Sequence, residues 1–518
     1  MWALDTIRLH LDALHPYIGA LQITEGVRWP WQGVGSDFRF GALQAWVSVP
    51  LVAFADTSAE VLARNAVFHA LGVLPMAWAG WRLSGWGAAF FAAACYAAWP
   101  ILIGHPIHGA YSYQAPVFVA LSAAFGAEAC VRPKRVWLVG TAIALGVAIS
   151  LHPIALAIAL AAVVTLPLLR EHYTRRDALW AIAMGALVTA PWLLDNTLHA
   201  LKRRASGAML TPQDPSMLEL PVPQLLYDAL SQTVAGWTPL ATTLCLAAPV
   251  LCILAGLGAR GHRSETGVKV LTAWTVGGLL AFTCLVAWMD YVQPYHWAVW
   301  LPLLFIATPT SCGALCRRWA PQLPKTVGTG VGLLAGGWAV TTTHSALPHL
   351  TFSGPPNVEQ RAIVQAASDA ITAHAGGATR TFAVLTDATG NTRGEPVALF
   401  FEQWLANEGD DKFPTTWIGD GPQAYVLANL SNPQWARWRE PRVPVPWSIP
   451  AGPGRQIRLL AFPTTTEAAE WLAHGCELLE RWPSLLIQGP QEGLGGLRGA
   501  PDGADPRLLE WVRLCPAE

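Results

Sequence analysis

Long apolar runs recur through the first two-thirds of the chain, and each is about as long as a bilayer is thick. A helix needs roughly twenty apolar residues to cross the hydrocarbon core, and in lipid it satisfies its own backbone groups, which an isolated strand cannot do. Charged residues make up only 13% of the 518 residues, against about a quarter in soluble proteins. We therefore expect an α-helical polytopic membrane protein with about ten transmembrane helices. The predicted spans are residues 61–81, 84–103, 111–130, 136–151, 153–170, 178–195, 237–258, 270–289, 297–315 and 326–344.

The apolar runs divide the chain into three predicted regions. Residues 1–60 precede the first span, and their one apolar stretch, 42–55, is short and broken by Pro50. We expect these residues to form an outer-face loop with amphipathic or re-entrant helices. Residues 61–345 are the transmembrane helical domain. In residues 346–518 charged residues return, which predicts a soluble domain.

The last third of the chain alternates helical and strand-like segments, which predicts a small α/β domain. Its second helix begins with Thr464 and Glu467, spaced as a capping box. Cys476 and Cys515 could pair as a disulfide outside the cytoplasm, but the sequence leaves open whether they lie within bonding distance. The predicted helices are 357–375 and 464–482, and the predicted strands are 381–387, 424–430 and 457–463.

Basic residues between the spans predict the orientation of the chain. Four clusters of Lys and Arg fall on one side of the predicted spans, and such clusters mark the cytoplasmic face. The opposite face receives the N-terminal loop, the loop 196–236, the turn 290–296 and the tail. We therefore predict a protein of the plasma (inner) membrane with an extracytoplasmic C-terminal domain. The clusters are Arg132, Lys134 and Arg135; Arg170, Arg175 and Arg176; Arg260, Arg263 and Lys269; and Arg317, Arg318 and Lys325.

Two features do not fit this orientation simply. Residues 1–60 lie outside with no preceding span, so we expect that an upstream helix is missing from the start of this sequence. Lys202, Arg203 and Arg204 fall on the outer face, although long loops follow the charge rule weakly. These three cations are either solvated or in contact with lipid headgroups, or they have a functional role.

The N-terminal loop concentrates ionisable residues beside an apolar segment at the membrane surface. Such groups are costly near a bilayer, so they usually pair or act in function. A solvated amphipathic surface helix is the other interpretation, and the residues alone leave both open. The ionisable residues are Asp12, His15, Glu25, Arg28, Asp37 and Arg39.

The N-terminal loop resembles the first periplasmic loop of the GT-C membrane glycosyltransferases, the superfamily of protein O-mannosyltransferases and aminoarabinose transferases. In that family the loop opens with an acidic residue, followed by a helix of aromatic and small residues, a Gly and a Pro-containing turn. Here Asp12 precedes Gly26 by fourteen positions, and Trp29-Pro30 follows. Ala13 departs from the pattern, because a second acid is common there.

Three further passages are similar to the same family, so the resemblance covers about residues 5–345. The segment 99–121 resembles the polar turn after an early helix pair, and 135–160 resembles a Gly-rich span followed by His-Pro. The segment 289–309 resembles the late turn that precedes a Pro-interrupted helix. The resemblance implies that Tyr295 and His296 meet the phosphate of a lipid carrier.

Inverting sugar transfer from a polyprenyl phosphate needs a general base and a site for the leaving phosphate. Asp12 is the first candidate for the base, with Glu25 and Asp37 in reserve. Donors to the phosphate could be Tyr295 and His296 together with the outer cations Lys202, Arg203 and Arg204. His296 could equally be an interfacial histidine.

Other residues carry weaker signals. His105 and His108 are spaced for a metal, but Pro106 separates them and the sequence offers no third ligand nearby, so no metal site is predicted. His152 precedes Pro153 and is expected near the cytoplasmic side as a helix-hairpin residue. The sequence contains no P-loop, no DxD and no zinc-spaced cysteines, which favours a lipid-linked donor over a nucleotide sugar. No cofactor is predicted, and a requirement for a divalent cation stays open.

These observations predict a glycosyltransferase that moves a hexose or pentose from a polyprenyl-phosphate donor to an acceptor glycan, lipid or protein. Its other expected partner is membrane lipid. The net charge of −1 offers no field for nucleic acid. One alternative is a transporter or flippase of a lipid-linked solute, which we rank lower because the middles of the spans are mainly Ala, Leu and Val. The other is a catalytically inactive scaffold with a GT-C-like fold.

Overall fold

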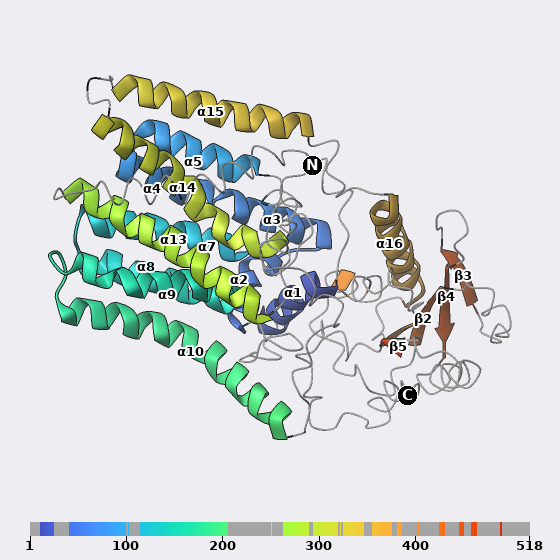
Figure 1. Cartoon of the computed structure of the whole chain (residues 1–518). Helices are drawn as coiled ribbons and strands as arrows, with labels where there is room; N and C mark the ends of the chain where they lie inside the picture. The colour runs from blue at the N-terminus through green and yellow to red at the C-terminus, as the bar shows by residue number, and fades with distance from the viewer. Residues whose placement is uncertain are drawn as a thin grey trace.

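The computed structural model shows a helical bundle with a mixed α/β domain at one of its ends (Figure 1). Most of the predicted span 237–258, all of the predicted helix 464–482, and both Cys476 and Cys515 lie outside the part of the chain that the structure describes. The described residues are 11–24, 41–99, 102, 114–205, 250, 263–289, 294–319, 322, 325–346, 355–375, 381–385, 399, 401–402, 424–429, 445–449, 457–463 and 487–488.

The bundle confirms a polytopic helical membrane fold. Four helical stretches among the described residues are long and apolar enough to cross a bilayer: Ser58–Ser84, Arg175–Leu198, Thr266–Val286 and His296–Trp319. Shorter apolar helices coincide with the predicted spans 84–103, 111–130, 136–151 and 153–170, and the predicted span 326–344 coincides with α15. The helices are α3 (Ser58–Ala70), α4 (Val73–Ser84), α5 (Trp86–Ala98), α7 (Ala115–Val131), α8 (Arg135–Leu151), α9 (Ala155–Thr165) with the short η3 (Leu166–Leu169), α10 (Arg175–Ala205), α13 (Arg263–Met289), α14 (Pro294–Trp319) and α15 (Lys325–Ala346).

Small residues allow these helices to approach one another closely. A methyl group added at Gly80 of α4 would lie 2.6 Å from the carbonyl oxygen of Ala88 on α5. One added at Gly146 of α8 would lie 2.8 Å from the carbonyl oxygen of Gly185 on α10. Association in lipid depends on such contacts because the apolar side chains gain little from leaving lipid for protein.

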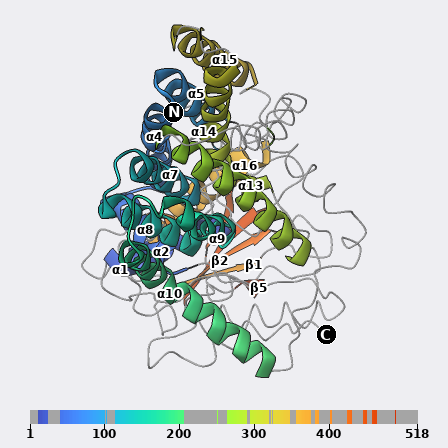
Figure 2. The same ribbon diagram turned by 60° about the vertical axis from the view of Figure 1, so that its left-hand side comes forward.

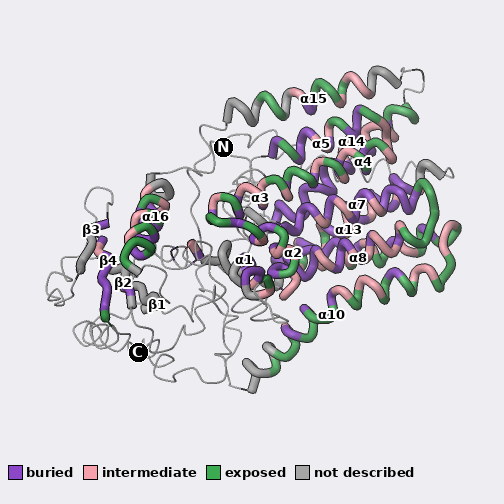
Figure 3. Tube along the Cα trace, turned by 180° about the vertical axis from the view of Figure 1, so that it is seen from behind, coloured by how far each residue is buried: buried purple, intermediate pink, exposed green. Residues whose placement is uncertain are grey.

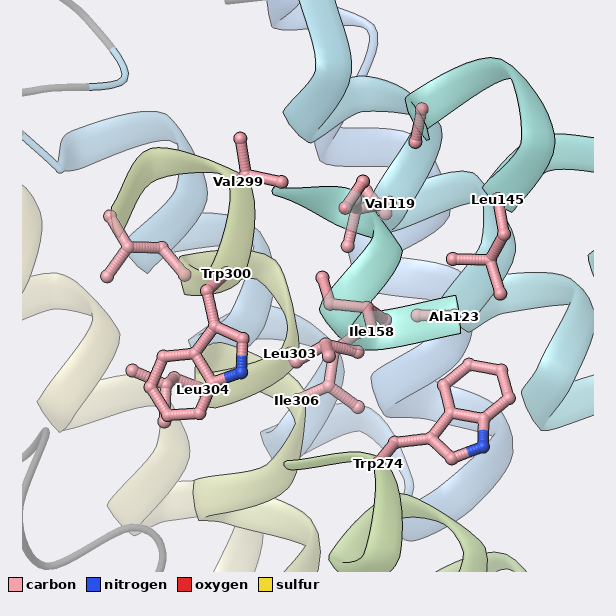
Figure 4. Close-up of a cluster of buried hydrophobic side chains, with 14 of the residues drawn as sticks. Val119, Ala123, Leu145, Ile158, Trp274, Val299, Trp300, Leu303, Leu304 and Ile306 are labelled. Atoms are coloured by element: carbon pink, nitrogen blue, oxygen red, sulfur yellow. The ribbon is translucent and has the colours of Figure 1, made fainter. Parts of the chain in front are cut away.

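Large aromatic side chains fill the middle of the bundle. Trp99, directly after α5, packs on Phe305 of α14 with ring centroids 5.0 Å apart, and Trp297 packs on Trp300 at 5.7 Å. Figure 4 shows a part of this core, in which side chains from α7, α8, α9, α13 and α14 converge. On the outside of the bundle, α10 and α15 are largely exposed or half-buried (Figure 3), as expected of helices that face lipid.

The described members of the four basic clusters lie at one end of the bundle, as their spacing predicted. Arg135 at the start of α8 forms an ion pair with Asp177 at the start of α10, with 2.5 Å between Nε and Oδ1. At the same end the start of α13 meets the end of α4, where Leu83 contacts Gly267. We call this the basic end. The helices α1 (Leu11–Thr24) and α2 (Leu43–Val52) lie at the other end (Figure 1), which we call the α1–α2 end.

The C-terminal domain also lies at the α1–α2 end (Figures 1 and 3). Its sheet has the order β3-β4-β2-β1-β5, with β1 and β2 parallel and the other neighbours antiparallel. Figure 2 shows β2, β1 and β5 beside one another. The helix α16 (Pro355–Ala375) covers the sheet with Ile363, Ala367 and Ile371, which recur every four residues. The strands are β1 (Thr381–Leu385), β2 (Ala424–Asn429), β3 (Val445–Ile449), β4 (Ile457–Phe462) and β5 (Ile487–Gln488).

The predicted strands at 381–387, 424–430 and 457–463 correspond to β1, β2 and β4, and the predicted helix at 357–375 corresponds to α16. We did not predict β3 or β5. Pro446 and the polar surroundings of β3 hide its strand pattern, since a proline lacks the amide hydrogen that a strand interior uses. Its partner β4 supplies the antiparallel pairing at the edge of the sheet.

The close approach of α4 and α5 predicts that Gly80→Ala destabilises the bundle. Its new methyl group would meet backbone atoms of Ala88, which cannot rotate away, so we expect a cost of about 1–3 kcal/mol and a lower unfolding temperature in detergent. Gly337→Ala on α15 is the matched control, because a methyl group there meets nothing within 4 Å. Equal unfolding temperatures for the two variants would contradict the packing.

Candidate active site

The N-terminal helices are held against the turn between α8 and α9. The amide of Gly41 donates a hydrogen bond to the carbonyl oxygen of Ser150 at 2.6 Å, and Nε2 of Gln44 donates to the carbonyl oxygen of Leu151 at 2.9 Å. Helix α1 packs on α2 where Gly19 faces Ala45, since a methyl group at Gly19 would lie 2.9 Å from Cβ of Ala45. These contacts carry the helix that bears Asp12 to the α1–α2 end of the bundle.

Two histidines meet at this end. His152 follows α8, His296 lies in the first turn of α14, and their ring centroids are 5.3 Å apart. Both side chains are buried, with 3% and 5% of their surface exposed. The amide of Ile154 donates to Nδ1 of His152 at 3.3 Å, so the neutral ring carries its proton on Nε2. The pair combines His296, predicted from the sequence, with a residue to which we had given no site role.

The expectation that placed His152 near the cytoplasmic side, and so near the basic clusters, disagrees with the structure. Helix α8 starts from the basic end at Arg135, and the segment after the turn returns to that end at Arg170. The turn between them therefore lies one helix length away, beside the N-terminal segment. The order of basic clusters and spans already implied this position.

A cluster of uncharged polar side chains lies beneath α2. Ser48 is fully buried one turn after Gln44. Nε2 of Gln114, just before α7, lies 3.2 Å from Oγ of Ser48 and 3.5 Å from Oδ1 of Asn65 on α3, and donates to both. His69 follows Asn65 by one helical turn and is also buried. We did not predict this cluster.

The description of the spans as mainly Ala, Leu and Val was therefore incomplete for the first of them. Asn65 and His69 are spaced i, i+4 within the predicted span 61–81, which places both on one face of a helix. That spacing was the feature of the sequence from which a buried polar cluster could have been predicted. Gln44 and Ser48 in the short segment 42–55 have the same spacing, and a polar pair on one face of an apolar helix predicts a polar partner.

The polar residues Gln44 and Ser48 of α2 lie on the side of the helix that packs on the bundle, and apolar residues lie on its outer side. Trp46, Pro50 and Phe54 are exposed at successive turns. Its C-terminus is held by Arg64 of α3, whose guanidinium donates to the carbonyl oxygens of Leu51 at 3.3 Å and of Phe54 at 2.7 Å. The helix has ten residues and covers about 15 Å, too little to cross the hydrocarbon core.

The C-terminal domain packs on the same helices through Leu399, Phe401 and Glu402. Phe401 packs on Tyr17 of α1 with ring centroids 6.2 Å apart, in a cluster that also contains Leu62 of α3. The amide of Ser58 donates to Oε2 of Glu402 at 3.2 Å, and the Ser58 hydroxyl donates to Oε1. Burial raises the pKa of Tyr17, which keeps its phenol neutral. The domain thus holds α1 and the N-terminus of α3 together.

The other predicted site residues are described in part or not at all. Asp12 lies on α1, Tyr295 lies in the first turn of α14, and Lys202, Arg203 and Arg204 lie in the last turns of α10, which reach the α1–α2 end (Figure 1). The side chains of these five residues, and all of Glu25, Asp37, His105 and His108, lie outside the described part of the chain. Among the side chains that the structure describes, no group of three or more His, Cys, Asp or Glu could hold a metal ion.

Comparison with known proteins identifies the fold. The chain is similar to the crystal structure of ArnT from Cupriavidus metallidurans in the apo state, with a TM-score of 0.53 and 15% sequence identity over 88% of this chain and 95% of that one. ArnT is a member of the GT-C superfamily. The chain has a GT-C fold. This confirms the fold that the N-terminal loop and the later passages predicted.

A second similar structure is the Archaeoglobus fulgidus oligosaccharyltransferase in complex with Zn and sulfate. Its TM-score is 0.44 at 13% identity, over 83% of this chain and 65% of that one. No protein-family model and no curated protein sequence matches the chain. The GT-C fold therefore rests on the three-dimensional arrangement, because sequence similarity to known proteins is low.

The contact between Glu402 and Ser58 predicts that Glu402→Ala loosens the C-terminal domain. Loss of the carboxylate leaves the amide and hydroxyl of Ser58 without their acceptor, at a cost of about 1 kcal/mol. We expect faster hydrogen exchange at the start of α3 and faster protease cleavage in the tail. Asp369→Ala is the control, because Asp369 is exposed and accepts a hydrogen bond from Gln365 on its own helix. Unchanged exchange in Glu402→Ala would show that the contact does not hold the domain.

Proposed function

We propose that this protein is an integral-membrane glycosyltransferase. It transfers a hexose or pentose from a polyprenyl-phosphate donor to an acceptor glycan, lipid or protein. The single observation that carries the proposal is the buried pair of His152 and His296, which lies where the N-terminal segment binds the α8–α9 turn. The likeness of the fold to ArnT supports the same reaction class.

The paired imidazoles suit the leaving phosphate. With Nδ1 accepting from Ile154, His152 directs a donor N–H from Nε2, and such donors stabilise the charge that develops on a departing phosphate. A buried site strengthens this interaction because the effective dielectric constant is lower there. Lys202, Arg203 and Arg204 would add positive charge from the last turns of α10, and Tyr295 would add a hydroxyl beside His296.

The transfer itself needs a base. The acceptor hydroxyl oxygen attacks the anomeric carbon, the bond from that carbon to the phosphate oxygen breaks, and polyprenyl phosphate leaves with the electron pair. A carboxylate takes the proton of the acceptor hydroxyl. We assign this role to Asp12 on α1, with Glu25 and Asp37 as the alternatives in the same loop. A divalent cation could assist, and neither the sequence nor the described residues require one.

The reaction takes place on the extracytoplasmic side of the plasma (inner) membrane. The basic end of the bundle then faces the cytoplasm, in keeping with the preference of Lys and Arg for that side. The α1–α2 end and the C-terminal domain lie outside. The donor's lipid chain stays in the bilayer while its phosphate reaches the two histidines from the membrane surface.

Asp12→Asn is expected to lower the rate of transfer at least about 100-fold, because it removes the base without changing the size of the side chain. The purified protein is assayed in nanodiscs with a panel of polyprenyl-phosphate sugars and acceptors, and donor binding is measured in parallel. Donor affinity should stay unchanged. Asp56→Asn, an exposed carboxylate at the same end, is the control. Full activity in Asp12→Asn would show that Asp12 is not the base and would leave Glu25 or Asp37 as the candidate.

Replacing either histidine of the pair should weaken binding of the carrier. We expect His152→Ala and His296→Ala each to reduce affinity for undecaprenyl phosphate about tenfold, since a hydrogen bond to a charged group is worth about 1.5–3 kcal/mol. Tryptophan fluorescence can report binding. His172→Ala, at the basic end, should bind the carrier like the unchanged protein. Carrier affinity that is insensitive to both site substitutions would contradict the proposed phosphate site.

A transporter or flippase is a second candidate. The buried polar residues Asn65 and His69 within the first span favour it, because solute pathways need polar groups at depth. Uptake of a lipid-linked solute into vesicles, with no transfer to any acceptor, would support transport. An inactive scaffold would neither transfer sugar nor bind the carrier.

A further inference from the structure

Several buried side chains of the membrane domain have polar atoms without a hydrogen-bond partner in the described structure, and three of these side chains lie close together. Their unpaired atoms are both ring nitrogens of His69, the hydroxyl of Tyr96 and Oε1 of Gln114. Each of these residues is at most 4% exposed. Leaving one such atom unpaired costs about 1–3 kcal/mol, and a bilayer offers no water to replace the missing partner.

The three side chains belong to neighbouring parts of α3, α5 and α7. Gln114 binds Asn65 on α3, and His69 follows Asn65 by one turn. Tyr96 of α5 reaches the break between α3 and α4, where a methyl group added at Gly72 would lie 2.6 Å from its ring carbon Cζ. Gly72 itself donates to the carbonyl oxygen of His69 at 2.9 Å. The unpaired atoms therefore lie around the broken end of α3.

Some of the other buried polar groups of the bundle have partners, and some, such as the hydroxyls of Thr275 and Thr310, do not. The carboxylate of Glu128 on α7 is 3% exposed and forms an ion pair with Arg82 of α4, and it also accepts from Nε1 of Trp78 at 2.8 Å. Trp274 of α13 donates to the hydroxyl of Thr165 at 2.8 Å. His69, Tyr96 and Gln114 share one place, around the broken end of α3, and we therefore treat their unpaired atoms as one group.

The chemistry of the unpaired atoms restricts what could bind them. A neutral imidazole offers one donor and one acceptor, a phenol offers both, and the oxygen of Gln114 accepts. None carries a full charge. A low-dielectric site of this kind disfavours a phosphate or a carboxylate, which would need a paired charge, and suits a neutral ligand with several hydroxyl groups, each of which both donates and accepts.

We propose that His69, Tyr96 and Gln114 form the subsite for the neutral sugar of the lipid-linked donor, with Asn65 and Ser48 orienting Gln114. The proposal rests on the proposed function, since it assigns the sugar of that donor. The phosphate would lie at His152 and His296, and the sugar would lie beneath α2. The subsite selects a ligand by hydroxyl groups and not by charge.

The experiment compares binding of undecaprenyl phosphate with binding of undecaprenyl phosphate that carries glucose, mannose or arabinose. The unchanged protein should bind at least one of the sugar-bearing lipids more tightly than the bare carrier. His69→Ala, Tyr96→Phe and Gln114→Leu should each reduce that affinity about tenfold and leave affinity for the bare carrier within twofold. Thr275→Val, which removes a buried unpaired hydroxyl on α13, should change neither affinity.

Stability gives a second readout that does not depend on the sugar. Tyr96→Phe removes an unpaired buried hydroxyl, so without ligand it should raise the unfolding temperature by about 2 °C. If the hydroxyl instead stabilised the fold through a hydrogen bond, its removal would lower the unfolding temperature. A lower unfolding temperature in Tyr96→Phe therefore overturns the assignment of Tyr96 as a ligand-binding group.

The outcomes separate the two proposals. The sugar subsite is overturned if the three variants lose the same affinity for the bare carrier as for the sugar-bearing lipids, or lose none for either. It is also overturned if the wild-type protein binds the bare carrier as tightly as every sugar-bearing form. In those cases the proposed transfer reaction is still supported by the pair of His152 and His296. An unchanged protein that binds none of the lipids contradicts the proposed function, and the sugar subsite fails with it.

Discussion

The scarcity of water inside a bilayer is the constraint on which the rest of this structure depends. Backbone amides and carbonyls in lipid must bond within the protein, so the described part of the membrane domain is built of helices. The same constraint makes every buried polar side chain significant. Where the bundle buries a charge, as at Glu128, it supplies Arg82 and Trp78 as partners. His69, Tyr96 and Gln114 keep unpaired polar atoms around the broken end of α3, and their common position underlies the proposed sugar subsite.

The second organising feature is the way in which segments far apart in sequence meet at one end of the bundle. The N-terminal segment binds the α8–α9 turn through Gly41 and Gln44, that turn brings His152 to His296, and the C-terminal domain packs Phe401 on Tyr17. The C-terminal domain is therefore more than an appended module, because its contacts hold the helix that bears Asp12. In the proposed reaction this support would position the base relative to the phosphate site.

Much of this arrangement could be predicted, because it follows from local rules. The apolar runs predicted the helices, the basic clusters predicted that their ends share one side, and the strand-rich segments predicted β1, β2 and β4. The errors have physical causes. Pro446 hid the edge strand β3, whose pairing comes from β4. His152 was placed at the wrong end although helix lengths implied the right one, and the i, i+4 pairs Gln44–Ser48 and Asn65–His69 passed unnoticed inside apolar segments.

The sequence by itself determined that this protein lies in a membrane, how its helices are ordered and which end collects basic charge. Hydrophobic length and loop charge act through lipid and water, which are the same for every such chain, so they can be predicted without a partner segment. Only the tertiary structure decided that His152 meets His296, that Gln114 reaches Ser48 and Asn65, and that Glu402 caps α3 at Ser58. These contacts join segments far apart in the sequence, so they depend on how the helices pack on one another, and such packing is specific to the folded chain.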